Sequence, residues 1–291
     1  MLYPLTMKIN HFICAVSFLA IASTSTLEAK GFLSSKDLPV SKNVYQNILP
    51  HKAIYEIELE SAKSGSQILD ISGKMYYGWE ASCEGWETDH RFNIVYEYAD
   101  TPPVEVKSDF TTLEDYAGKT LDFSSRRKRN EKLFEEFRGQ ASVSEDKIGG
   151  AKYSIPQDLD HDLTPGTLLP VAHTLKMIEN AKSNARFFNA VIFDGSDEKG
   201  GYEVNAFIGK PFSKADVERT ENIDTSLLES QLWPLRLAFF PQNQKTAQPE
   251  YEMQLNLHES GIVSSMTIAY EDFAVKQKLI ALEALNFPEC E

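Results

Sequence analysis

The chain has 291 residues, of which 42% are hydrophobic and 11% aromatic, a composition typical of globular rather than disordered proteins. Its formal net charge of −14 argues against a nucleic-acid binder, because phosphate contacts require a basic surface. The same charge argues against broad electrostatic adhesion to an anionic membrane.

The N-terminal segment 1–29 has the pattern of an export signal. Lys8 precedes an apolar run at 12–22, and the run ends in small residues of the kind that signal peptidase prefers. The run is shorter than the roughly 20 apolar residues of a transmembrane helix, so we expect cleavage and no membrane span in the mature protein. A retained anchor is the alternative. Residues 30–50 are polar and form a lead-in segment before a domain at 51–291.

Alternation of apolar and polar residues predicts strands from position 51 onward. In 51–60, Tyr55 and Ile57 alternate with glutamates, which is typical of a strand with one wet face. Met75, Tyr77 and Trp79 form the apolar row of a second strand. The two runs are separated by a short Ser-Gly-Ser turn and should pair as a hairpin.

Later segments repeat this pattern, and at least ten strands without an obvious linker predict one mainly β domain. Strands are expected at 92–98, 104–110, 121–125, 132–137, 139–143, 201–209, 233–240, 251–257 and 262–270. We expect 186–194 to be a strand covered on both faces, because it is almost continuously apolar. The stretch 144–165 is expected to be irregular. Segment 273–285 fits either a last strand or a short helix.

One principal helix is predicted at 167–180. Thr167 is placed to cap its start, and Pro170 lies in the first turn, where its missing N–H costs little. Apolar residues at helical spacing, including Leu175, predict the buried stripe. His173 lies off that stripe and is expected at the surface.

A search for catalytic or metal-binding motifs finds none. Three aspartates alternate in 158–162, but Leu163 and Leu169 occupy the places where an EF-hand loop requires Gly and Glu. The histidines are scattered and we assign them structural or surface roles: His51, His90, His161, His173 and His258. The tryptophans are expected in the core. We therefore expect no catalytic residue, no metal and no cofactor.

One dense basic run, Arg126-Arg127-Lys128-Arg129, interrupts the acidic chain. The plainer interpretation is a solvated loop or a strand edge whose charges discourage edge-to-edge pairing. The functional interpretation is a positive rim for an anionic group, such as a lipid headgroup or an acidic partner. These four residues are the candidate ligand-binding residues.

Removal of the signal leaves two cysteines, Cys83 and Cys290. An even number in an exported chain predicts a disulfide, and two unpaired buried thiols are the alternative. So long a loop would contribute on the order of 5 kcal/mol by the chain-entropy estimate. The absence of a CxxC pair gives no support to thiol–disulfide catalysis.

Several motifs resemble those of the EipB family, an α-proteobacterial family linked to cell-envelope integrity. They are His51-Lys52-Ala53 with Tyr55, Gly73-Lys74-Met75, Cys83-Glu84-Gly85-Trp86, Phe193-Asp194-Gly195-Ser196, Trp233-Pro234 and the terminal Cys290. The resemblance implies a periplasmic protein whose antiparallel sheet is strongly curved, as a β-spiral or open barrel around a broad cavity, with a few short helices beside the principal one. It also implies that Cys83 and Cys290 are the disulfide pair.

The resemblance offers no catalytic residues, in agreement with the motif search. The resulting hypothesis is a non-enzymatic periplasmic protein that supports envelope integrity by binding a lipid-like ligand, a protein partner, or both. An envelope hydrolase with unidentified carboxylates, or a purely structural interaction module, is the alternative.

Overall fold

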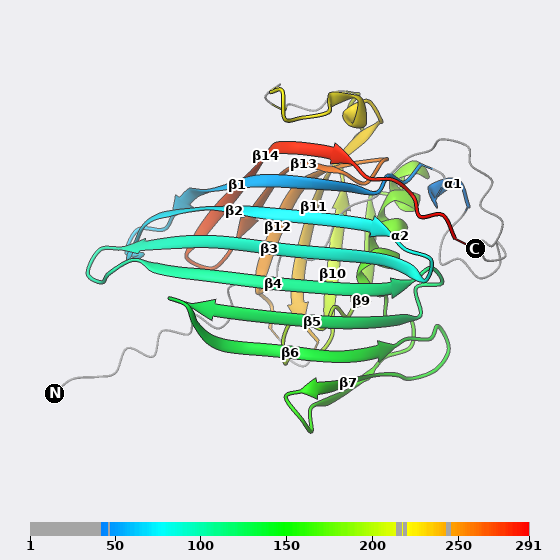
Figure 1. The fold of residues 1–291 in the computed structure, drawn as a ribbon, viewed down its shortest axis with the longest axis horizontal. Helices are drawn as coiled ribbons and strands as arrows, with labels where there is room; N and C mark the ends of the chain where they lie inside the picture. Colours follow the sequence, from blue (N-terminus) through cyan, green and yellow to red (C-terminus); the bar gives the residue numbers. More distant parts are fainter. Residues whose placement is uncertain (1–41, 46, 214–216, 218–219, 243–245, 291) are drawn as a thin grey trace.

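The structure is a computed structural model that describes residues 42–45, 47–213, 217, 220–242 and 246–290 (Figure 1). The expected signal segment 1–29 and most of the lead-in segment 30–50 lie outside the described residues. Strand β1 begins at His51, where the sequence places the start of the ordered domain.

Fourteen strands form one antiparallel sheet, in the order β8-β7-β6-β5-β4-β3-β2-β1-β14-β13-β12-β11-β10-β9. Strands that follow each other in the chain pair in the sheet, with one exception: β8 and β9, which α2 separates in the chain, are the two terminal strands. The first strand, β1, pairs with the last, β14. The strands are β1 (His51–Ala62), β2 (Ile68–Ala81), β3 (Gly85–Tyr98), β4 (Val104–Asp115), β5 (Thr120–Arg129), β6 (Lys132–Ser142), β7 (Gly149–Ile155), β8 (Asp160–Leu163), β9 (Phe187–Ile192), β10 (Tyr202–Ile208), β11 (Leu232–Pro241), β12 (Tyr251–His258), β13 (Val263–Ala269) and β14 (Phe273–Ala284). The helices are α1 (Lys42–Tyr45), α2 (Pro170–Lys182) and the 3-10 helix η3 (Thr225–Leu228).

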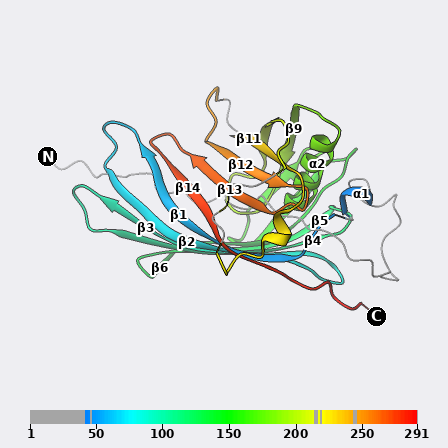
Figure 2. The same cartoon turned by 90° about the horizontal axis from the view of Figure 1, so that it is seen from above.

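The sheet curls until its two ends meet. The chain leaving β8 bonds to β9: the Leu168 N–H donates to the Val191 carbonyl (2.8 Å), and the Phe193 N–H donates to the Leu168 carbonyl (3.0 Å). Viewed from above, β2–β6 run along one side of the molecule and β11–β13 along the other, with α2 beside β9 (Figure 2). The predicted fold class, a strongly curved antiparallel sheet with one principal helix, is confirmed.

The alternation read from the sequence sets the inward face of the sheet. In β2, Met75, Tyr77 and Trp79 are buried, and the strand pairs with β1 as the predicted hairpin. The three tryptophans are buried, as expected. A second buried cluster lies under β4–β7, where Phe193 packs on Phe123 with ring centroids 5.7 Å apart.

Two predictions about the later strands are wrong. β9 is the last strand of the sheet and is not covered on both faces: Phe187 is 73% exposed and Asn189, on the same face, is also exposed. The stretch 144–165 contains β7 and β8 instead of an irregular loop. Gly149 suits a strand there because a Cβ at this position would lie 2.3 Å from the Ser142 carbonyl oxygen of the neighbouring strand.

The predicted cap of the principal helix is also wrong. The helix starts at Pro170, and Leu169 occupies the N-cap position without a side-chain hydrogen bond. The Thr167 hydroxyl donates instead to the Thr164 carbonyl (2.7 Å). Pro170 does lie in the first turn, as predicted.

The first turn of α2 is capped from a distant strand by Glu114 of β4. The carboxylate oxygens accept hydrogen bonds from the N–H groups of Val171 (2.7 Å) and Ala172 (2.8 Å). These N–H groups have no acceptor within the helix, so the two oxygens of Glu114 satisfy donors that would otherwise be buried without a partner. Burial raises the pKa of Glu114 to about 8, and the two N–H groups oppose that rise.

His173 is fully buried and not at the surface, which corrects the sequence-based expectation. Its ring stacks on Phe188 of β9 with centroids 5.7 Å apart, so the helix is buried on the face of His173 as well as along the predicted stripe of Leu175.

We expect Glu114→Ala to lower the free energy of unfolding by on the order of 2–4 kcal/mol, because two buried N–H donors lose their acceptor. Urea denaturation monitored by circular dichroism measures the change. Asp109→Ala on the exposed face of the same strand is the matched control and should shift stability by no more than about 0.5 kcal/mol. Equal stability of the two variants would contradict the capping role.

Candidate functional site

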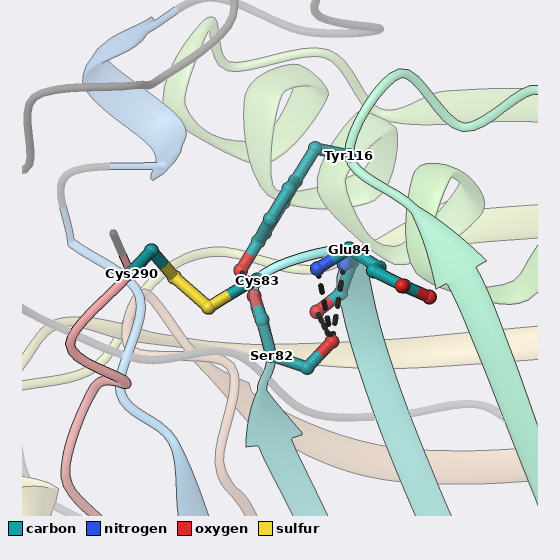
Figure 3. Close-up of a disulfide and its surroundings, with 6 residues drawn as sticks. Ser82, Cys83, Glu84, Tyr116 and Cys290 are labelled. Carbon is teal, nitrogen blue, oxygen red and sulfur yellow. Dashed lines mark hydrogen bonds between the residues drawn. A yellow bond between two sulfur atoms is a disulfide. The ribbon is translucent and has the colours of Figure 1, made fainter.

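A disulfide joins Cys83, in the turn between β2 and β3, to Cys290, in the tail that follows β14 (Figure 3). The two Cα atoms lie 5.6 Å apart, within the usual range for a disulfide. The bond spans 207 residues of sequence and therefore encloses almost the whole sheet. The predicted pairing is present in the structure.

The turn that holds Cys83 is organised by its neighbours (Figure 3). The Ser82 hydroxyl accepts from the N–H groups of Glu84 (3.3 Å) and Gly85 (3.2 Å). The Tyr116 hydroxyl donates to the Ser82 carbonyl (2.6 Å). These bonds fix the direction in which Cys83 leaves the sheet and present its sulfur to the C-terminal tail.

The basic run 126–129 belongs to β5, which lies between β4 and β6. The interpretation as a solvated loop or strand edge is therefore wrong. Arg126 and Lys128 alternate with Arg127 and Arg129, so the run is divided between the two faces of the sheet. Arg126 faces outward and forms an ion pair with Glu136 (3.7 Å).

Arg127 is buried in the interior of the curled sheet. Its guanidinium pairs with Glu135 of β6 and donates to the Ser196 carbonyl (2.9 Å). Ser196 follows β9, so this arginine joins the middle of the sheet to the segment that closes it. Burial raises the pKa of Glu135, and the Arg127 charge opposes the rise.

The inward face carries buried polar atoms as well as apolar side chains. Among the described residues, buried side-chain atoms without a hydrogen-bond partner include Nε2 of His51, Nε2 of His90, Oγ of Ser125 and Oε1 of Gln277. Buried polar groups in native proteins are nearly always satisfied by protein, water or ligand. The inward face therefore has hydrogen-bonding capacity that the described protein atoms do not use.

Burial lowers the pKa of the buried histidines, which stay neutral near pH 7. The values are about 4 for His51, about 3 for His90, about 3 for His173 and about 4 for His258. In the described part of the chain, no three His, Cys, Asp or Glu side chains come together as metal ligands would.

Two open grooves are lined mainly by outward-facing side chains. One, of about 740 Å³, lies over β3–β7 and includes Thr111, Asp122, Arg138, Gln140 and Lys152. The other, of about 650 Å³, lies over β1, β2 and β14 and includes Lys52, Tyr76 and Glu283. The broad inner cavity implied by the family resemblance stays a prediction.

No helix in the described residues has both the length and the apolar character needed to cross a membrane. A curled antiparallel sheet of fourteen strands among the described residues, with a disulfide that ties one end, defines a β-barrel-like class of protein.

The chain belongs to the EipB-like family, whose sequence model matches residues 42–286. It is 29% identical to the cell envelope integrity protein EipB of Brucella abortus (strain 2308) over 239 residues, which are 81% of this chain and 84% of the relative. The fold is similar to the crystal structure of a β-barrel-like protein of a domain of unknown function from Brucella abortus. That similarity has a TM-score of 0.75 at 30% identity and covers 82% of this chain and 98% of the other.

Two carboxyl groups that bind structural partners, the buried Glu114 and the partly buried Glu135, were not predicted as such from the sequence. Glu114 belongs to the row Phe110–Thr112–Glu114 of β4. In a strand with one solvent-exposed face, side chains at these alternate positions point inward. A charged residue at an inward-facing position was therefore the one sign in the sequence that Glu114 has a structural role. Its partner, a helix N-terminus 57 residues away in sequence, could not be read from that pattern.

We expect replacement of both Cys83 and Cys290 by serine to lower the free energy of unfolding by up to about 5 kcal/mol, because the unfolded chain regains the entropy of a very long loop. Urea denaturation of the variant and of the wild type, with and without reductant, measures the effect. Thiol alkylation of native wild-type protein followed by intact-mass analysis should add no label. Two free thiols in native protein would contradict the bond.

Proposed function

We propose that this protein is a non-enzymatic periplasmic factor that supports cell-envelope integrity by binding a lipid-like ligand inside its curled sheet. The observation that carries the proposal is membership of the EipB-like family together with the match to a cell envelope integrity protein of Brucella abortus. The disulfide agrees with an oxidising compartment, because such bonds persist outside the cytosol.

The inward face supports the ligand part of the proposal. Apolar side chains would take an acyl chain, for which each buried CH₂ contributes about 0.8 kcal/mol. The polar atoms on the same face, such as Nε2 of His90 and Oγ of Ser125, would take the polar end of an amphiphile. α2 packs beside β9, where it would close one end of the bound ligand's space.

The hydrolase alternative requires two carboxyl groups about 5–9 Å apart in an accessible pocket. Three buried or partly buried carboxyl groups are instead bound to structural partners. Glu114 caps α2, Glu135 pairs with Arg127, and Asp194 accepts from the N–H (2.9 Å) and the hydroxyl (2.6 Å) of Ser196. These contacts favour a binding protein over a hydrolase.

Protein purified under mild conditions from the periplasm of its own host should carry a bound amphiphile. Native mass spectrometry should show a mass above that of the mature chain, and lipid extraction should recover the molecule. The same protein passed over a hydrophobic resin is the matched control and should lose the extra mass. Recovery of the unmodified mass alone in the starting material would contradict lipid carriage.

A second candidate function, docking of an envelope protein partner, is favoured by the first residues of the terminal strand β9, which precede the contact of Leu168 with Val191. Edge strands offer unpaired backbone groups to a second chain. On the outer face, Phe187 (73% exposed) and Phe207 (44% exposed) lie side by side with ring centroids 5.5 Å apart. Two adjacent exposed aromatic side chains are typical of interface anchors.

We expect a photo-reactive amino acid at position 187 to cross-link this protein to a specific envelope protein in intact cells. The same amino acid at position 287, where Phe287 is 44% exposed but lies in the C-terminal tail, is the control and should give no such product. Capture of the same proteins from both positions would count against β9 as the docking edge.

A further inference from the structure

Arg129 differs from the other three residues of the basic run. It is the last residue of β5 and continues the inward row of Phe123, Ser125 and Arg127. Its neighbour across the ladder is Val106 of β4, which is fully buried in the main core. The arginine is therefore the outermost inward-facing residue of its strand, at the border between the core and solvent.

The guanidinium of Arg129 is held in place but not fully hydrogen-bonded. Its carbon lies 4.6 Å from the ring centroid of Phe134, in a cation–π contact. In the described part of the chain, its Nε and Nη2 atoms are shielded from solvent and have no hydrogen-bond acceptor. A shielded charged donor without an acceptor is costly, and guanidinium fits carboxylate and phosphate well.

The surroundings of Arg129 suit the head of an amphiphile. Tyr98, half-buried at the end of β3, is close enough for the Arg129 charge to oppose the rise that burial causes in the pKa of the Tyr98 hydroxyl. Inward from the arginine, Val106 and Ile94 are buried members of the apolar core. A charged group at Arg129 would thus lie next to the apolar core.

The location also separates this point from the tied end of the sheet. β5 ends on the side of the molecule opposite to the C-terminus, and α1 and α2 lie on the C-terminal side (Figure 1). The disulfide and the cap of α2 close one end of the curled sheet, and Arg129 stands at the other end. If an amphiphile entered by this end with its acyl chain first, its polar headgroup would come to lie at Arg129.

We propose that Arg129 is the anion-binding residue of the ligand site and that the ligand is a single-charged-head amphiphile with a carboxylate or phosphate group. This inference rests on the proposed function, because it assumes that an amphiphile occupies the curled sheet. It assigns a role to one residue of the basic run and leaves Arg126 outside the site.

The test compares three ligands of equal chain length by displacement of a fluorescent fatty acid from delipidated protein: hexadecanoic acid, hexadecyl phosphate and hexadecanol. Arg129→Met should weaken binding of the acid or the phosphate at least tenfold and leave hexadecanol unchanged, because only the charged head loses its donor. The anion that loses more affinity identifies the headgroup class. Arg126→Met, on the same strand but facing outward with its side chain 55% exposed, should change none of the three affinities.

The outcomes are distinguishable. Equal weakening of acid and alcohol by Arg129→Met means that the residue only supports packing, and unchanged affinity means that it does not touch the ligand; either overturns the inference while ligand binding stands. If Arg129→Met does not fold, the affinities of the wild type for the three ligands are compared instead. Wild-type protein that binds hexadecanol as tightly as both anions overturns the inference. A wild type that binds none of the probes removes the ligand proposal, and this inference with it.

Discussion

The pairing of the first strand with the last is the interaction on which the rest of the structure depends. β1 and β14 are hydrogen-bonded along their whole length, from His51 opposite Ala284 to Ala62 opposite Phe273. Without that ladder the chain would be two meanders, β1–β8 and β9–β14, each with an exposed edge. The Cys83–Cys290 bond adds a covalent tie across the same junction, because it fixes the tail of β14 to the far end of β2.

Most of the strands could be predicted from the sequence, because side chains on a half-buried sheet alternate and that alternation is local. The row Met75–Tyr77–Trp79 and the hairpin of β12 and β13 are examples. Order within the sheet is not local. Nothing in the pattern of 186–194 distinguishes a central strand from a terminal one, and the exposure of Phe187 follows only from the position of β9 in the sheet.

The candidate site shows the same limit. The charge of the run 126–129 is visible in the sequence. Which of its side chains face inward and which face outward follows only from its position as a strand within the sheet. The start of α2 was misplaced for a related reason. Thr167 is a good local cap, yet Glu114, brought from β4 by the fold, supplies both acceptors. A tertiary contact replaced the local preference in each case.

The position of β1 in the sheet has a consequence for how the chain matures. Synthesis delivers β1 first and β14 last, so one edge of β1 has no partner until the chain is nearly complete. For that interval the protein exposes a twelve-residue template for association with other chains. Cys290 lies beyond β14 in the chain, so the bond to Cys83 can form only after the last strand has been made.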